Sequence, residues 1–228
     1  MGNKLVVLLT VALVALLTGG TAWADSVPIN NPSFEITNPL TISCGYPNCA
    51  YTYGIPDWNV GNGGTWRPGP VVFPSMPDGT LAAFTNHGSI WQTLSSTVLP
   101  DTTYTLNVFV GNRADGINGP YTLSLDTILN GVLTTLCSTP ALNANDIAAH
   151  TFQSEGCSYT SNSTVPGGNL FLIFTSLGGQ LDVDDVTLTD QPMTTVPEPG
   201  SALLLVAGLA LAIGFGLWSK QRTNAVSA

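Results

Sequence analysis

The sequence predicts an all-β fold, a β-sandwich, for the central part of the chain. Only 8 % of the 228 residues are charged, too few for a coiled coil or a solvated helical bundle, whose surfaces are dense in Glu, Lys and Arg. Residues 25–190 show no extended apolar pattern of helical period, whereas short segments of alternating apolar and polar residues recur. Clusters of Gly, Pro, Asn and Asp separate these segments, as turns separate strands.

About nine of these segments are expected to be strands. The clearest is Tyr104–Val110, in which every second residue is apolar, and Asn169–Thr175 is a Phe- and Ile-rich run typical of a buried strand. The other candidates are short and flanked by turn residues: Ile29–Ile36, Thr80–Asn86, Ser89–Leu94, Tyr121–Asp126, Val132–Leu136, Ala148–Gln153 and Leu181–Thr189. So many short strands in one domain favour a β-sandwich or a jelly roll.

Residues 1–24 have the three parts of a secretory signal peptide. Lys4 supplies the positive charge, Leu5–Leu17 is an apolar run, and Ala22-Trp23-Ala24 is a small-x-small cleavage site. An uncleaved anchor is the alternative, but this run would extend only about 20 Å as a helix, against about 30 Å of hydrocarbon. We therefore expect export, with the mature chain beginning at Asp25.

A second apolar run near the C-terminus predicts a transmembrane helix. Ser201–Trp218 contains no charged residue and would extend about 27 Å as a helix, enough to span a slightly thinned membrane. Lys220 and Arg222 follow it, which places this end in the cytoplasm and the preceding domain outside. Residues 191–199 contain several prolines and are predicted to be a linker.

The segment before the apolar run carries a recognisable motif. It is Val196-Pro197-Glu198-Pro199-Gly200-Ser201. Pro-Glu-Pro followed by an apolar helix and a short basic end, over residues 196–222, resembles the PEP-CTERM sorting signal of Gram-negative bacteria. The resemblance implies export by the Sec translocon, a transient stay in the inner membrane, processing by an exosortase, and release to the cell surface or medium, often together with exopolysaccharide. A plain stop-transfer anchor is the alternative.

Three segments of the central domain resemble the galactose-binding-like jelly rolls. Asn30–Glu35 resembles their opening strand, Ile55-Pro56-Asp57-Trp58 the segment that follows, and Leu181–Leu188 their closing Asp-Asp-Val strand. The resemblance implies a jelly-roll sandwich over residues 25–190. Pro32 stands where the family usually has Gly, which removes a backbone donor.

The charge of the central domain limits its partners. Residues 25–190 contain two cations, Arg67 and Arg113, and thirteen acidic residues, a net charge of −11. This charge favours cation binding, and the lack of clustered Lys and Arg excludes a nucleic-acid interface.

Four cysteines in an exported chain predict two disulfides. Of the three possible pairings, Cys44–Cys49 with Cys137–Cys157 would close one tight turn and one longer loop. A zinc site is the weaker alternative, because no Cys-x-x-Cys pair occurs, and free thiols are another.

A calcium site is predicted where the first and last strands meet. Apolar residues alternate on both sides of Asp184-Asp185 but with opposite parity, which predicts a β-bulge there. A bulge can turn a carboxylate inward, where it needs a cation or several donors, and oxygen clusters suit Ca²⁺. The jelly-roll resemblance likewise implies a structural calcium near Glu35 and Asp185. The alternative is a carboxylate held by backbone N–H groups.

Familiar catalytic motifs are absent from the sequence. It has neither a Gly-x-Ser-x-Gly elbow nor a His-Glu-x-x-His helix, and His87 lies far from His150. The sequence therefore predicts a protein that is not an enzyme, although it leaves open a pair of carboxylates for glycoside hydrolysis.

Two tryptophans are candidate sugar-binding residues. Trp66, beside Arg67 in a Gly- and Pro-rich stretch, is predicted to be an exposed platform, and Trp91 faces away from the core by alternation. Sugar rings pack on such aromatic faces. The alternatives are that Trp66 folds back onto its own loop and that Trp91 packs beneath another loop.

These observations predict an exported, non-enzymatic adhesion module that binds a neutral glycan through Trp66, Arg67 and Trp91. The net charge disfavours acidic polysaccharides as ligands. The alternatives are a structural envelope component without a ligand and a polysaccharide hydrolase.

Overall fold

The computed structural model describes residues 24–113, 115–165 and 167–193. The predicted signal peptide, apart from Ala24, and the predicted sorting signal at 196–222 lie outside these residues, as does most of the linker. Within the described ranges, the structure contains no helix of the length and apolarity needed to cross a membrane.

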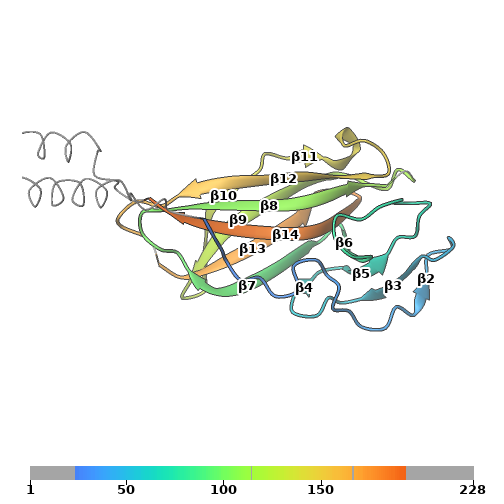
Figure 1. The fold of residues 1–228 in the computed structure, drawn as a ribbon, viewed down its shortest axis with the longest axis horizontal. Helices are drawn as coiled ribbons and strands as arrows, with labels where there is room; N and C mark the ends of the chain where they lie inside the picture. Colours follow the sequence, from blue (N-terminus) through green and yellow to red (C-terminus); the bar gives the residue numbers. More distant parts are fainter. Residues whose placement is uncertain (1–23, 114, 166, 194–228) are drawn as a thin grey trace, which may run out of the picture. The chain divides into compact units, whose positions relative to one another are not determined.

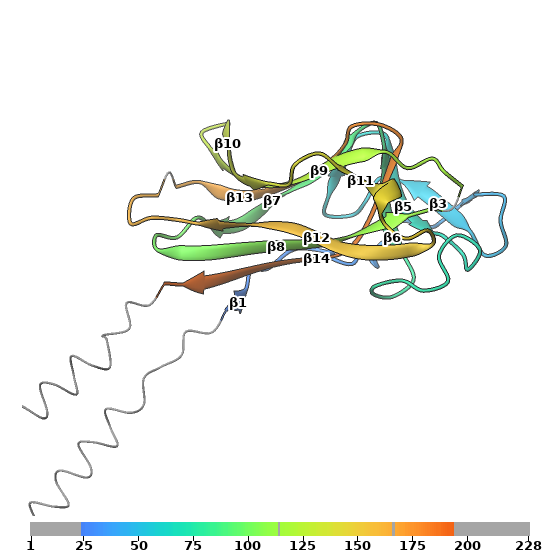
Figure 2. The same cartoon turned by 90° about the horizontal axis from the view of Figure 1, so that it is seen from above.

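The described residues form a sandwich of two antiparallel sheets, as predicted (Figures 1 and 2). The first sheet has eight strands, in the order β12-β8-β14-β6-β5-β3-β2 with β1 beside β14. Its strands are β1 (Asp25–Ser26), β2 (Ile42–Ser43), β3 (Ala50–Tyr53), β5 (Gly63–Arg67), β6 (Ala82–Asn86), β8 (Thr102–Asn112), β12 (Thr151–Thr160) and β14 (Gln180–Pro192).

The second sheet has six strands, in the order β10-β9-β13-β7-β4 with β11 beside β9. Its strands are β4 (Asn59–Val60), β7 (Ser89–Thr97), β9 (Pro120–Leu129), β10 (Val132–Ser138), β11 (Leu142–Asn143) and β13 (Asn169–Ser176). A single 3₁₀ turn, η1 (Ala144–Asp146), is the only helical element in the part of the chain that the structure describes.

The main core lies between the two sheets and follows the predicted alternation. Leu106 and Val108 on β8 are fully buried against side chains of the facing sheet such as Leu123 and Phe174. Removing such side chains from water contributes about 25 cal/mol for each Å² of apolar surface buried. This alternation therefore sets which face of each long strand points inward.

The strand predicted at Ile29–Ile36 is wrong. Asn31 and Phe34 have φ angles of 49° and 59°, in the left-handed region, so this segment turns rather than extends. The Asn31 side chain stabilises the turn, because its Oδ1 accepts from the N–H of Ile36 at 3.0 Å and its Nδ2 donates to the Ile36 carbonyl at 2.9 Å. The segment that follows β1 is therefore a turn and not a strand.

The β-bulge predicted at Asp184-Asp185 is confirmed. The register of β14 against β8 shifts between Asp184 and Thr187, and Asp185 has a φ of 44°. As a result, Val183 and Val186 both point into the main core although they are three residues apart. The Asp184 side chain is fully buried.

The structure contains the disulfides Cys44–Cys49 and Cys137–Cys157. The first closes the turn between β2 and β3. The second joins β10 to β12, which are the outermost strands on one side of the two sheets. It therefore links the two layers of the sandwich covalently.

We expect removal of Cys137–Cys157 to cost more stability than removal of Cys44–Cys49. The two bridges span 20 and 5 residues, and the loop-closure entropy predicts losses of about 3 and about 2 kcal/mol in the free energy of unfolding. Urea denaturation of the two Cys→Ser double variants measures both values. Equal losses, or a larger loss for the short loop, would contradict the entropic explanation.

Candidate functional site

The outer face of the eight-stranded sheet, which points away from the second sheet, carries a row of aromatic side chains. Tyr51 and Tyr53 come from β3, Trp66 from β5 and Phe84 from β6, and the register places Tyr51 opposite Trp66. The ring of Tyr51 packs edge-to-face at 5.7 Å from the ring of Tyr53 and at 5.7 Å from that of Phe84. Such contacts fix the rings relative to one another.

Part of this outer face is covered by the loop between β5 and β6. Phe73 from this loop packs against Trp66, with ring centroids 6.1 Å apart, and also against Phe152 of β12, at 4.4 Å. These side chains belong to a second apolar cluster, separate from the main core. Around β6, the first sheet is therefore apolar on both of its faces.

Beside the covering loop, a pocket of about 330 Å³ opens on the outer face. We call it the aromatic pocket. Its walls are Tyr51, Tyr53, Trp66, Phe84, Cys44, Ser43, Asn86, Arg113 and Gln180. Its volume is within the range of small-molecule sites, which combine apolar walls with a few polar groups.

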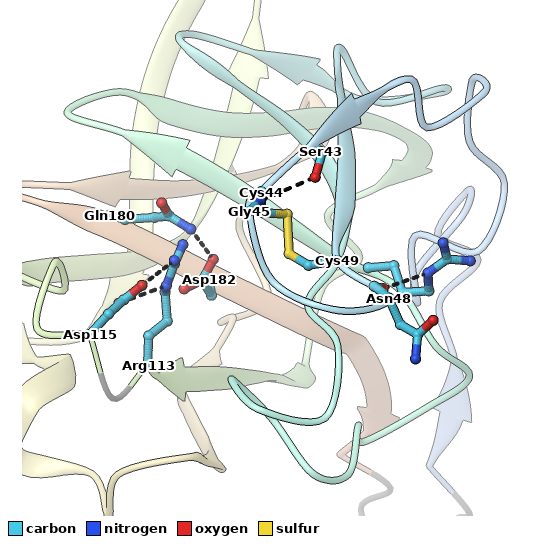
Figure 3. Close-up of a disulfide and its surroundings, with 10 residues drawn as sticks. Ser43, Cys44, Gly45, Asn48, Cys49, Arg113, Asp115, Gln180 and Asp182 are labelled. Carbon is cyan, nitrogen blue, oxygen red and sulfur yellow. Dashed lines mark hydrogen bonds and ion pairs between the residues drawn. A yellow bond between two sulfur atoms is a disulfide. The ribbon is translucent and has the colours of Figure 1, made fainter.

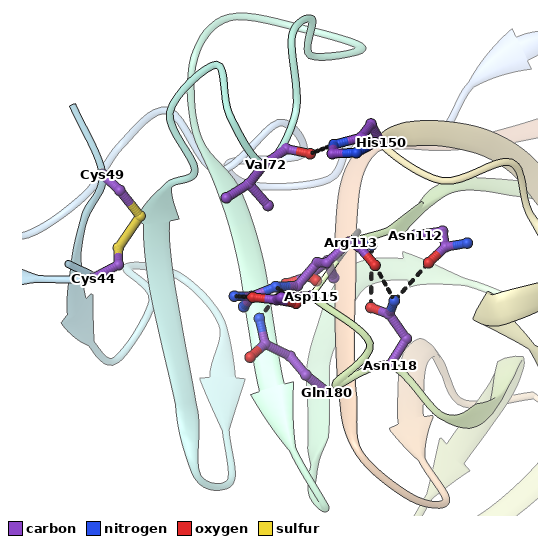
Figure 4. Close-up of polar contacts among 10 residues, drawn as sticks. Cys44, Cys49, Val72, Asn112, Arg113, Asp115, Asn118, His150 and Gln180 are labelled. Atoms are coloured by element: carbon purple, nitrogen blue, oxygen red, sulfur yellow. Dashed lines mark hydrogen bonds and ion pairs between the residues drawn. A yellow bond between two sulfur atoms is a disulfide. The ribbon is translucent and has the colours of Figure 1, made fainter. Parts of the chain in front are cut away.

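Arg113 forms one wall of the aromatic pocket. Its guanidinium carbon lies 4.6 Å from the centre of the Trp66 ring, a cation–π contact. Its Nε and Nη2 both donate to the carboxylate of Asp115. The backbone of Arg113 is held by the Asn118 amide, which accepts from its N–H at 3.3 Å and donates to its carbonyl at 2.8 Å (Figure 4).

Asp182 lies next to this wall and is fully buried (Figure 3). Gln180 Nε2 donates to its Oδ1 at 2.6 Å, whereas Oδ2 has no hydrogen-bond partner among the described residues. Burial raises the pKa of Asp182 to about 7, even though the charge of Arg113 and the Gln180 hydrogen bond lower it. Titratable groups perturbed in this way are concentrated at functional sites.

The exposed aromatic platform predicted at Trp66 is wrong. Trp66 is only 2 % exposed, because Phe73 and Arg113 pack on its ring. Arg67 points the opposite way and its Nε donates to the carbonyl of Asn48 at 3.0 Å. Trp91 belongs to β7 in the second sheet. The three residues therefore form no common site, and only Trp66 lines the aromatic pocket.

The predicted calcium ligands are arranged differently from the prediction. The Asp184 carboxylate accepts from the N–H of Asp185 at 2.8 Å and of Asp78 at 3.2 Å. Glu35 Oε1 accepts from the N–H of Thr80 at 2.8 Å and of Leu81 at 2.7 Å. No group of three or more His, Cys, Asp or Glu side chains within the described ranges is placed to hold a metal. Backbone donors thus reach both oxygens of Asp184 but only Oε1 of Glu35, and calcium stays a prediction.

Despite these hydrogen bonds, the pKa of Asp184 is raised. Burial raises the pKa of Asp184 to about 8, the two backbone N–H groups lower it, and the nearby carboxylates of Asp185 and Glu35 raise it further. Two carboxylates close to a third without a cation favour its protonated form.

The sequence-based reasoning missed most residues of the aromatic pocket. Tyr51, Phe84 and Gln180 lie in segments that carry no motif. Two signals were available: Arg113 is one of only two cations in an acidic domain, and Asp182 interrupts the apolar residues of a predicted strand. Neither signal shows which other strands lie beside these residues.

The chain is similar to one protein family and to several solved structures. The family model HpiC1-like, described as HpiC1 cyclase, matches residues 25–189. An apo form of a cyclase from Fischerella sp. is 22 % identical with a TM-score of 0.60, covering 75 % of this chain and 98 % of that chain. A cyclase from Fischerella sp. TAU is also 22 % identical, with a TM-score of 0.58 and coverage of 76 % and 100 %.

A more distant structure is the CBM22-1 xylan-binding domain from Paenibacillus barcinonensis Xyn10C, which is 10 % identical with a TM-score of 0.46 and coverage of 77 % and 100 %. No curated protein sequence matches the chain.

The buried aspartates predict that stability falls as pH rises. The pKa values of Asp182 and Asp184 in the folded state, about 7 and about 8, lie above the ordinary 3.8. Between these values the folded chain binds more protons than the unfolded chain. The stabilisation by the two protonated carboxyl groups is therefore complete below pH 3.8, and it is lost as the pH rises to 7 and 8. Melting temperatures from pH 4 to pH 9 measure the decline.

Asp182→Asn tests which group is responsible, because Asn cannot ionise and its Oδ1 can still accept from Gln180. The variant should melt above the wild type at pH 8.5, and this advantage should shrink at pH 5. Asp101→Asn, at an exposed position, is the control and should show no such dependence. A constant offset for Asp182→Asn at every pH would show that its ionisation is not responsible.

Proposed function

The chain belongs to the HpiC1-like family of cyclases, and we propose that its β-sandwich is an enzyme that closes a ring in a small molecule bound in the aromatic pocket. The observation that carries this proposal is the combination of aromatic walls with a buried carboxyl group whose pKa lies near neutrality. This combination meets the two needs of such a reaction, a shaped apolar cavity and a proton-transfer group.

Membership of this family corrects the functional predictions made from the sequence. A non-enzymatic adhesion module sorted by an exosortase is wrong, because the matching family is a family of cyclases. A small-molecule substrate replaces the predicted partners, which were the exosortase, the Sec translocon, an exopolysaccharide or neutral glycan, and a membrane bound through a C-terminal helix. The absence of a motif misled the prediction, since the pocket draws its residues from separate strands.

The aromatic walls have a direct role in ring closure. A cyclisation needs a flexible substrate to be held in one folded conformation, which a rigid apolar cavity achieves by excluding the others. Ring-forming steps that develop positive charge also gain from aromatic faces, whose quadrupoles attract cations. Tyr51, Trp66 and Phe84 provide such surfaces, and their mutual packing holds them in place.

Asp182 is the group that we assign to proton transfer. General acids and bases work best when their pKa lies near the operating pH, and the pKa of Asp182 is raised to about 7. Gln180 separates Asp182 from the pocket and is bonded to it, so contact with a substrate requires the Gln180 side chain to turn aside. The unpartnered Oδ2 of Asp182 is the oxygen that would then act.

We expect Asp182→Asn to lower the cyclisation rate at least about 100-fold, the typical contribution of a general acid or base. The assay incubates metabolites from a strain lacking this gene with the purified chain and follows substrate loss and product gain by mass spectrometry. Asp126→Asn is the matched control, since Asp126 is also buried, at 2 % exposure, but lies in the second sheet. Equal activity of both variants would remove Asp182 from the mechanism. No metabolite converted by the wild type would contradict the proposed function itself.

A second proposal concerns the bulge of β14, where calcium would neutralise Asp184, Asp185 and Glu35. All three offer oxygen donors, which Ca²⁺ prefers, and Glu35 Oε2 has no hydrogen-bond partner in the described part of the chain. The supporting observation is the mutual proximity of the carboxylates, which raises the pKa of Asp184.

If calcium binds here, EGTA should lower the melting temperature and millimolar CaCl₂ should restore it, because a ligand specific to the folded state stabilises that state. Glu35→Gln keeps the acceptor for Thr80 and Leu81 but removes one charge, and it should lose this response. An unchanged melting temperature with EGTA would reject the site.

A further inference from the structure

Arg113 occupies an unusual place for a cation in this domain. Residues 25–190 contain only Arg67 and Arg113 as cations, and Arg67 lies on the surface. The Arg113 side chain is only 9 % exposed and forms part of the wall of the aromatic pocket. Burying a guanidinium is unfavourable unless it is paired. The groups that contact Arg113 therefore indicate its role.

Several contacts hold the guanidinium in one orientation. The Asn118 side chain accepts from the backbone N–H of Arg113 and donates to the backbone carbonyl of Arg113. Nδ2 of Asn118 also donates to Oδ1 of Asn112 at 2.6 Å. The guanidinium lies over the ring of Trp66. Its Nε and Nη2 donate to the carboxylate of Asp115 (Figure 4). The remaining nitrogen, Nη1, has no hydrogen-bond partner among the described residues.

The carboxylate that neutralises Arg113 lies outside the aromatic pocket. Asp115 lines a neighbouring pocket together with Tyr46 and His150, whereas Arg113 lines the aromatic one. The ion pair thus lies between the two pockets: Arg113, whose Nη1 is not taken up by Asp115, lines one of them, and the carboxylate lines the other. The aromatic pocket therefore has an end that donates hydrogen bonds but has almost no net charge.

The charges favour one kind of ligand. A second carboxylate would have to share a cation that Asp115 already neutralises, within a domain of net charge −11. An ammonium group would meet N–H donors instead of acceptors. A neutral carbonyl or amide oxygen can accept from Arg113 with neither penalty.

We propose that the Arg113–Asp115 ion pair makes the aromatic pocket select uncharged substrates that carry a hydrogen-bond acceptor at one end of an apolar body. Arg113 donates to this acceptor, and the aromatic rings hold the apolar body. The inference rests on the proposed function, because it specifies the substrate class of the same pocket.

Three probes of similar size test the selectivity on the purified full chain. Phenylacetamide is neutral, phenylacetate is anionic and 2-phenylethylamine is cationic. Binding is followed through the arginine Nε–H signals in ¹H–¹⁵N spectra, which come from Arg67, Arg113 and Arg222 and are assigned with Arg67→Lys. Phenylacetamide should shift the Arg113 signal, and phenylacetate should bind at least about tenfold more weakly. The amine should leave the signal unchanged.

Asp115→Asn provides the decisive variant, since it frees the charge of Arg113 without replacing a residue of the pocket wall. The affinity for phenylacetate relative to phenylacetamide should rise about tenfold, as expected when a charge-assisted bond becomes available. Asp101→Asn removes the same unit of charge from an exposed loop and should leave this ratio unchanged. Asp115 is partly exposed, at 26 %, so the variant is expected to fold.

An unchanged ratio in Asp115→Asn would overturn the inference, as would an Arg113 signal that responds to none of the probes. These measurements need no turnover. If selectivity is found but no metabolite is converted, the cyclase proposal fails while the selectivity stands. If conversion occurs but the ratio does not respond to Asp115→Asn, the cyclase proposal stands and this inference fails.

Discussion

The two-residue alternation of the first sheet is the constraint on which the rest of the structure depends. On β14, Leu181 and Val183 enter the main core, so Gln180 and Asp182 must point to the outer face. On β6, Ala83 enters the core and Phe84 therefore faces outward. The packing between the two sheets thus holds in place the strands that carry the aromatic pocket. The walls of the pocket are therefore fixed by the main core beneath them.

A sheet that is apolar on both faces needs a second cover, and the loop between β5 and β6 supplies it. Phe73 closes over Trp66, while Glu35 and Asp184 accept hydrogen bonds from the far end of the same loop. The covered part is stable because its apolar surface is removed from water. The uncovered part, beside the loop, is the aromatic pocket.

The polar groups around the pocket are less well satisfied than those elsewhere in the described sandwich. Of the three buried side-chain atoms without a hydrogen-bond partner among the described residues, two belong to Trp66 and Asp182 beside the pocket, and the third belongs to Thr65 on the opposite face of β5. A buried polar atom without a partner costs about 1–3 kcal/mol. All three come from strands β5 and β14, which contribute residues to the pocket walls, and such costs are expected where function competes with stability.

The sequence alone was enough to determine the all-β sandwich, the long strands such as β8 and the bulge at Asp184, because these follow from local alternation and turn chemistry. It could not show that Trp66 is covered, or that Tyr51 lies near Arg113 and Gln180. Alternation tells which residues of one strand share a face, but not which strands are neighbours. Only the strand order β14-β6-β5-β3, set by long-range pairing, brings these distant residues together.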